Sequence, residues 1–141
     1  VAGVKVLDDK YVMLEGYGAP FALIGISDIS LQGSALSNIS KQIDEEQGAC
    51  MKVLLVHEPQ YFEDYATAGV DLVFAGHAHG GQFNLPVFGP LVAPGQGFFP
   101  KYAKGEYRSG KTHMIVSAGI GNSIVPVRLF NYPELVVVDI K

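Results

Sequence analysis

Two short, mostly apolar runs that each end at a histidine constrain this chain most strongly. Residues 52–56 and 71–75 have the composition of buried strands, and they lead into His57 and His77. Between the two runs, residues 58–69 show a short helical pattern that begins at a Glu-Pro pair and ends at a glycine. This order predicts a β-α-β unit with parallel strands. Both histidines should then lie at the carboxyl edge of one sheet, where ligands bind in α/β folds.

The remaining pattern predicts an α/β domain that occupies the whole chain. A length of 141 residues is typical of one domain, and the sequence has no internal repeat and no low-complexity tract. The other predicted elements, in chain order, are a hairpin of residues 4–7 and 11–15, a strand buried on both faces over 21–26, a surface helix from Asp28 or Ser30 to Gln47, a loop-rich excursion with short hairpins over 80–110, and strands over 113–118 and 135–140.

Composition excludes several classes of protein. The chain has 10 basic and 14 acidic residues and no cluster of Lys and Arg, so a nucleic-acid binder held by phosphate contacts is disfavoured. The longest stretch without polar side chains, residues 85–95, is broken by prolines and is too short to cross a bilayer. The single cysteine, Cys50, excludes an internal disulfide and a cysteine-based zinc cluster. An apolar fraction of 48% against 17% charged residues therefore needs another explanation.

His79 lies two residues after His77, and this spacing suggests a pair of metal ions. Neighbouring strands are about 4.8 Å apart, so the imidazoles of His57 and His77 can converge on one ion. In an extended segment, His79 would project to the same side about 6 to 7 Å further along. That reach suits a second ion of a binuclear site.

Glycines near these histidines favour a ligand role over the alternative, in which the histidines are merely polar residues on a turn. Because glycine has no side chain, Gly76, Gly80 and Gly81 would let the backbone approach closely. His113 starts a strand on a different segment. We expect it to be an ordinary edge or surface histidine.

The residues around the histidines resemble those of a known family. The segment 56–59 and the segment 71–82, which contains Gly-His-Ala-His-Gly-Gly-Gln, are similar to the C-terminal half of calcineurin-like metallophosphoesterases. The resemblance is to a bacterial subgroup whose members often carry a membrane anchor or an export signal. It covers nearly the whole chain, and the other matching positions are Pro86, Gly105, Tyr107, residues 116–121, Pro126, Arg128, Pro133 and Glu134.

The resemblance implies an α/β fold that is half of a four-layer α/β/β/α sandwich, with residues 1–141 as the C-terminal portion of the catalytic domain. It implies two divalent metal ions, and Mn, Fe and Zn all suit such a donor set. His57 and His77 would bind one ion and His79 the other. Ala78 stands where the family usually has threonine, a change that should not affect ligation. The family's other ligand motifs, Asp-x-His, Gly-Asp and Gly-Asn-His, are absent from this sequence, which implies a missing N-terminal half.

For a full-length parent, the resemblance implies metal-dependent hydrolysis of a phosphomonoester, phosphodiester or pyrophosphate. The histidines must be neutral to ligate, so metal occupancy should fall as pH drops through the imidazole range. For these 141 residues alone, we expect weak metal binding and negligible turnover. The alternative is a non-catalytic metal-binding or interaction domain that never had the first half.

Three further residues are candidates for contact with the substrate phosphate. Gly121 and Asn122 follow a predicted strand, where backbone N–H groups could line the site or simply form a tight turn. Arg128 could bind phosphate bidentately, pair with Glu134 or face solvent. Gln82 could help to shape the rim of the site.

The aromatic residues of the 83–105 excursion leave two alternatives open. They could form an apolar wall for a lipid-linked phosphoester, or belong to a hairpin that packs on the sandwich. The resemblance also raises membrane association or export for a bacterial full-length parent. The apolar composition predicts a sheet face left bare where the missing half should pack, so the isolated chain should self-associate as a two-fold dimer.

Overall fold

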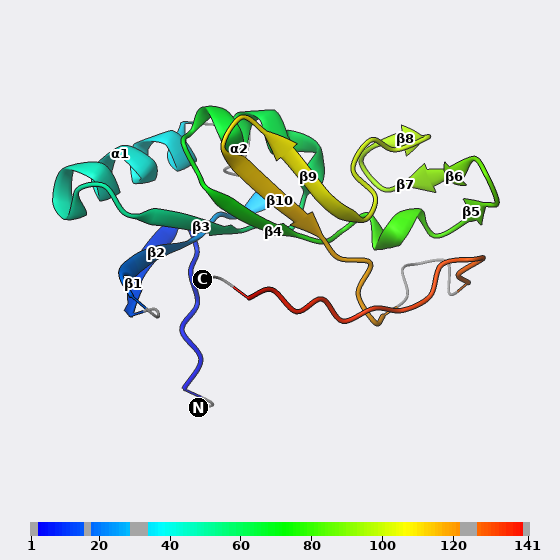
Figure 1. Cartoon of the computed structure of the whole chain (residues 1–141), viewed down its shortest axis with the longest axis horizontal. Coiled ribbons are helices and arrows are strands. Elements are labelled where there is room, and N and C mark those ends of the chain that lie inside the picture. Colours follow the sequence, from blue (N-terminus) through cyan, green and yellow to red (C-terminus); the bar gives the residue numbers. More distant parts are fainter. Residues whose placement is uncertain (1–2, 16–17, 29–33, 122–126, 140–141) are drawn as a thin grey trace.

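The computed structural model describes residues 3–15, 18–28, 34–121 and 127–139. Its main sheet has six strands in the order β1-β2-β3-β4-β10-β9 (Figure 1). The inner strands β2, β3, β4 and β10 are parallel, and the edge strands β1 and β9 are antiparallel to their neighbours. The bounds are β1 (Lys10–Glu15), β2 (Pro20–Gly25), β3 (Met51–Leu55), β4 (Leu72–Ala75), β9 (Gly105–Ser109) and β10 (Thr112–Val116). The predicted α/β class is confirmed.

The β-α-β unit around the two histidines is also confirmed. β3 and β4 pair in parallel, with Val53 opposite Leu72. Their connection is a single 3-10 turn, η2 (Pro59–Tyr61), followed by the helix α2 (Phe62–Thr67). The hydroxyl of Tyr65 donates to the carbonyl of Glu58 at 2.6 Å, which ties the helix to the chain leaving β3.

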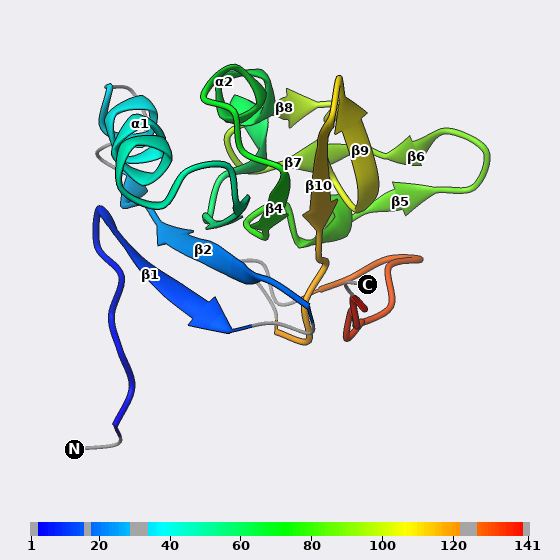
Figure 2. The same cartoon turned by 60° about the vertical axis from the view of Figure 1, so that its left-hand side comes forward.

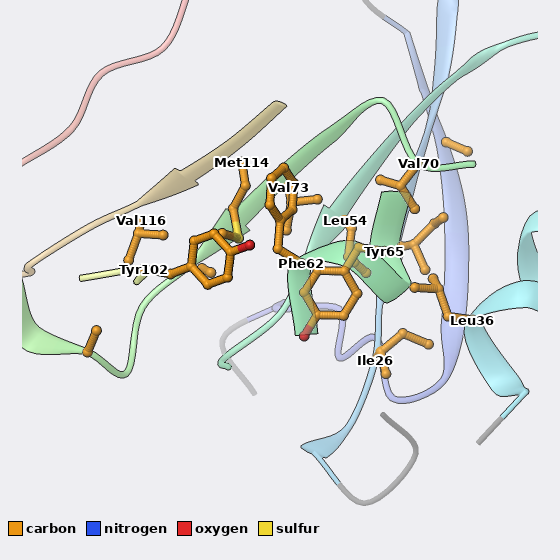
Figure 3. Packing of buried hydrophobic residues seen from close by; sticks show 14 of the residues in the cluster. Ile26, Leu36, Leu54, Phe62, Tyr65, Val70, Val73, Tyr102, Met114 and Val116 are labelled. Atoms are coloured by element: carbon orange, nitrogen blue, oxygen red, sulfur yellow. The ribbon is translucent and has the colours of Figure 1, made fainter. Parts of the chain in front are cut away.

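Both helices lie on one face of the sheet and close its core (Figure 1 and Figure 2). The helix α1 (Ala35–Gln47) buries Leu36 and Ile43, and it ends at Gly48, whose φ of 71° a side chain would disfavour. Figure 3 shows the rings of Phe62 and Tyr65 from α2 among side chains that rise from the strands. The strand positions of this core are the register row Ile24, Leu54, Val73 and Met114, all fully buried.

The opposite face of the sheet is only partly covered, which corrects the prediction of strands buried on both faces. Leu55, Phe74 and Ile115 lie in register on this face, and Leu55 is 42% exposed. The C-terminal segment 127–139 runs along this side in both views (Figure 1 and Figure 2). Between that segment and the strands, a recess of about 470 Å³ is lined by these three side chains, Leu135 and other residues.

The predicted hairpin at the start of the chain is wrong in its pairing. Residues 11–15 do form a strand, but β1 pairs with β2 instead of residues 4–7. The side chain of Asp9 accepts hydrogen bonds from the N–H and hydroxyl of Ser27, and Leu7 lies against Gly25. These contacts direct residues 3–9 past the end of β2 instead of back along β1.

The predicted strand over 135–140 is also wrong across the residues that the structure describes. Residues 135–139 do not form a strand, although Glu134 donates its N–H to the carbonyl of Gly119 at 3.1 Å. A strand needs a neighbour for its backbone groups, and this segment lies over the open face of the sheet instead of beside one of its edges (Figure 1). The four-layer sandwich stays a prediction, since the described part of the chain has one main sheet with helices on one face.

The loop-rich excursion carries the short hairpins that its composition predicts. After the 3-10 turn η3 (His79–Gly81), β5 (Asn84–Leu85) pairs with β6 (Gly89–Pro90), and β7 (Val92–Ala93) pairs with β8 (Gly97–Phe98). In the part of the chain that the structure describes, no helix has the length and apolarity needed to span a membrane.

Candidate metal centre

His57 and His77 meet at the carboxyl edge of the parallel sheet, as predicted. His57 follows β3 and His77 follows β4, and the N–H of Gly76 donates to the carbonyl of His57 at 3.1 Å. Their imidazole rings lie edge to face, with centroids 4.4 Å apart and planes at 60°. The β-α-β topology therefore brings two potential nitrogen ligands into direct contact.

The turn that carries His77 and His79 is not extended, which corrects the basis of the predicted spacing. Both histidines have left-handed φ angles, 57° and 47°, with Ala78 in a helical conformation between them. The N–H of Gly81 donates to the carbonyl of Ala78 at 2.7 Å and closes a tight turn. His79 is thus placed by this turn instead of by the pleat of a strand.

His79 is close enough to the other two histidines to respond to their charge. Burial lowers the pKa of His79, and the positive charges of Arg128, His77 and His57 lower it further. A lowered pKa keeps the imidazole neutral at neutral pH, which is the form that binds a metal ion.

Two of the three glycines do make the predicted close approaches. A Cβ on Gly81 would lie 2.3 Å from Cβ of Pro90, and one on Gly80 would lie 2.5 Å from Oδ1 of Asn131. Both glycines also have positive φ. Gly76 does not follow the prediction, because a Cβ there would meet nothing within 4 Å.

Asn131 is a site residue that sequence reasoning missed. Its buried side-chain amide donates to the carbonyl of His79 at 2.5 Å, which holds the backbone of the histidine turn. A parallel bridge between Phe83 and Leu129 lies beside this contact. Asn131 is 52 residues from His79 in the sequence, and no local pattern signals a contact of that range.

Arg128 binds the backbone after β10 in this structure. Its Nη2 donates to the carbonyl of Ala118 at 2.8 Å and also to the carbonyl of Gly121. Nε and Nη1 of the same guanidinium are buried and have no hydrogen-bond partner within the described ranges. The alternative pairing partner, Glu134, instead forms an ion pair with Lys104 at 2.8 Å.

The other candidate residues differ in where they lie. Gly121 is exposed, and Asn122 lies outside the described residues. Gln82 is buried, and its carbonyl accepts from the N–H of Leu129 at 3.0 Å.

His113 lies near the start of β10, where its Nδ1 is 2.8 Å from Oε1 of Glu106. His113 therefore takes no part in the histidine edge.

Across the described ranges, no group of three or more His, Cys, Asp and Glu side chains is arranged to hold a metal ion. The histidine edge thus offers a contacting pair of imidazoles and a third imidazole nearby, with no carboxylate ligand among them. Metal ions in binuclear centres usually share carboxylate and imidazole ligands. The donor set fits part of such a centre.

Several bacterial proteins are among those similar to this chain. The metallophosphoesterase YkuE of Bacillus subtilis is 39% identical over 63% of this chain and 30% of its own length. A metallophosphoesterase of Aquifex aeolicus is 34% identical over 99% of this chain and 52% of its own. The phosphodiesterase YaeI of Escherichia coli is 26% identical over 99% and 48%.

The chain spans about half or less of the length of these relatives. No protein-family model matches the chain, and no solved structure matches it significantly.

Proposed function

Because the chain belongs to the calcineurin-like metallophosphoesterase family, we propose that it supplies His57, His77 and His79 to a centre of two divalent metal ions that hydrolyses phosphoesters. The observation that carries this proposal is the contact between the rings of His57 and His77, 4.4 Å apart at the carboxyl edge of the sheet. His57 and His77 would hold one ion and His79 the other. When bound, such ions polarise the phosphoryl group and activate water.

The chain's own residues prepare this edge in two ways. The lowered pKa of His79 favours its neutral form, so protons compete with a metal ion less than they would at an ordinary histidine. Asn131 fixes the carbonyl of His79, which limits the positions that the imidazole can reach. Both effects reduce the ordering that metal binding would otherwise require.

The remaining ligands are proposed to come from the part of the relatives' length that this chain does not span. Two imidazoles on one ion and one imidazole on the other, with no bridging carboxylate, leave each ion of Mn, Fe or Zn short of the ligands that it usually takes from a protein. We therefore propose that the 141-residue chain binds metal weakly and has negligible turnover, and that the missing N-terminal half completes the centre. Residues 1–141 would then be the C-terminal portion of the catalytic domain.

Arg128, Gly121 and Asn122 remain proposed contacts for the substrate phosphate. Arg128 has two buried nitrogen atoms, Nε and Nη1, without a partner among the residues that the structure describes, and a phosphate could accept from both only after a rearrangement that exposes them. The carbonyl of Gly121 is already bound to Arg128, so its N–H would make the contact. The substrate class, a monoester, diester or pyrophosphate, lipid-linked or not, stays open.

Hydrolysis of bis(p-nitrophenyl) phosphate with added Mn²⁺ tests this function. We expect activity from the full-length protein, loss of at least about a hundredfold for His77→Ala, and no measurable turnover from the 141-residue chain. The matched control is His113→Ala, which should retain activity because His113 bonds Glu106 away from the edge. Full activity of His77→Ala, or robust activity of the isolated chain, would contradict the proposal. No activity in the full-length protein would favour a non-catalytic domain.

A further inference from the structure

The excursion between η3 and β9 exposes apolar side chains that the proposed metal centre does not use. At the turn between β5 and β6, Val87 is 100% exposed and Phe88 is 73% exposed. At the end of β8, Phe98 is 76% exposed and Phe99 is 66% exposed. We call these two pairs the apolar tips. Large apolar side chains grouped at the surface mark contact sites for proteins or membranes.

The two hairpins form one continuous meander. The N–H of Leu91 donates to the carbonyl of Phe83, and the N–H of Phe99 donates to the carbonyl of Leu91, both at 2.8 Å. The segment 89–93 therefore lies between the other two and joins them. Both hairpins project beyond the body of the six-stranded sheet at the end where β4 leads into η3 (Figure 1).

The base of this meander is anchored in the core, so the apolar tips are carried by a fixed support. The side chain of Gln96 exchanges two hydrogen bonds with the backbone of Tyr102, at 2.9 and 2.8 Å. The ring of Tyr102 is buried and lies edge-on to the rings of Phe62 and Tyr107. The four side chains of the apolar tips are each at least 66% exposed, which argues against the alternative of a hairpin packed wholly on the sheet.

The chemistry of the tips suits hydrocarbon better than a protein partner. Residues 85–88 and 97–99 contain no side chain that can form a hydrogen bond. Protein interfaces carry about one hydrogen bond per 100 to 200 Å² and a polar rim, whereas a bilayer interior needs no such partners. No Asp or Glu occurs between Asp71 and Glu106, so the excursion carries no negative side chain in a chain of net charge −4. Anionic headgroups would not be repelled there.

We propose that the apolar tips insert into the interfacial layer of a lipid bilayer and hold the protein on the membrane surface. A bilayer adapts to two convex projections, while a protein partner would need matching pockets. The meander follows His79 directly, so docking through it would keep the histidine edge close to the headgroup layer. The inference does not require the metal centre, and its test uses no metal.

Co-sedimentation with vesicles of equimolar phosphatidylcholine and phosphatidylglycerol tests the proposal in the 141-residue chain. The wild type should bind, and Val87→Ser with Phe88→Ser should lower the partition coefficient at least about tenfold, because insertion buries both side chains. The matched control, Leu135→Ser with Val137→Ser, changes comparably exposed apolar residues of the segment over the partly covered sheet face. At a protein concentration at which the wild type is monomeric, this control should bind as the wild type does. Absence of wild-type binding, or unchanged binding of the tip variant, would overturn the proposal.

A fluorescent reporter locates the inserted surface independently. The chain has no tryptophan, so Phe88→Trp places a single tryptophan at one tip and Leu135→Trp places one on the segment over the sheet face, and each can be excited selectively over the seven tyrosines. We expect vesicles to shift the Phe88→Trp emission to shorter wavelength and leave Leu135→Trp unchanged. A shift of Leu135→Trp alone would overturn the proposal, because the bare sheet face would then be the membrane contact. Circular dichroism of each variant confirms that the fold is retained.

Discussion

The two faces of the six-stranded sheet are held by different kinds of interaction. On the helix side, Phe62 and Tyr65 of α2 pack onto a row of fully buried strand residues. On the other side, the segment 127–139 lies over the strands and leaves Leu135 and Val137 each 86% exposed. The first face is closed by apolar packing, and the second is not.

Polar contacts hold the segment on the second face. Glu134 accepts from the N–H of Ala118 and pairs with Lys104, and Asn131 donates to the carbonyl of His79. Such bonds fix position but add little net free energy. The high apolar fraction of the chain follows from this difference: the sequence carries apolar residues for two faces, and only one face is fully covered within the described residues.

The largest change in the free energy of unfolding should come from truncating a buried side chain on the face that the helices cover. Phe62→Ala removes a ring that is 1% exposed, and we expect a loss of about 3 to 5 kcal/mol in the free energy of unfolding. Leu135→Ser on the other face should change it by less than about 0.5 kcal/mol. Urea unfolding measures both. Similar losses at the two positions would mean that the faces do not differ.

A smaller loss is expected where a polar contact fixes the second face. Asn131→Ala removes the donor to His79 and should cost about 1 to 3 kcal/mol, because the carbonyl of His79 loses its partner in a partly buried hydrogen bond. Asn38→Ala, on the exposed side of α1, is the control and should cost less than about 0.5 kcal/mol. Equal costs in thermal unfolding would show that the contact contributes nothing specific.

The oligomeric state of the isolated chain tests whether the partly covered sheet face forms a dimer interface. We expect the isolated chain to dimerise through this face and Leu135→Ser with Val137→Ser to raise the dimer dissociation constant at least about tenfold. Light scattering over a concentration series measures both. A wild type that stays monomeric at high concentration would remove the self-association proposal.

The smallest effect concerns the pH dependence of the second face. Burial acts to raise the pKa of Glu134, but the N–H of Ala118 and the ammonium of Lys104 outweigh it, so the pKa is lowered. A lowered folded-state pKa stabilises the protein above the unfolded value near 4.5, and this stability is lost as pH falls through the folded value. Glu134→Gln should remove at most about 1 kcal/mol at neutral pH, and it should weaken the loss of stability that sets in as pH falls below the unfolded-state pKa of the carboxyl. An unchanged acid slope would exclude Glu134 as its source.

Sequence patterns predicted the parts of the fold that depend on local periodicity. The two strands before His57 and His77, and the helix between them, follow from short apolar runs and their Pro and Gly boundaries. The hairpin of residues 4–7 failed because its alternative, the pairing of β1 with β2, depends on contacts of Asp9 with Ser27 across the sheet. The strand over 135–140 failed because a strand requires a neighbour, which a single segment's pattern cannot reveal.

The candidate site shows the same division. Topology alone placed His57 beside His77, because parallel strands end at one edge. The turn at His79 could not be predicted, since left-handed φ angles at non-glycine residues are uncommon and here depend on packing with Gly80, Gly81 and a distant Asn131. Period and topology are readable in a sequence, whereas contacts between distant segments are not.

The central claim is that His57, His77 and His79 form one metal-binding edge. Titration of the ¹⁵N-labelled chain with Zn²⁺, followed through the imidazole nitrogen resonances, tests it directly. We predict that His57 and His77 shift with the same midpoint, that His79 also shifts, and that His113 does not. A Zn²⁺-induced shift of His113 equal to theirs, or no shift at His77, would contradict the claim.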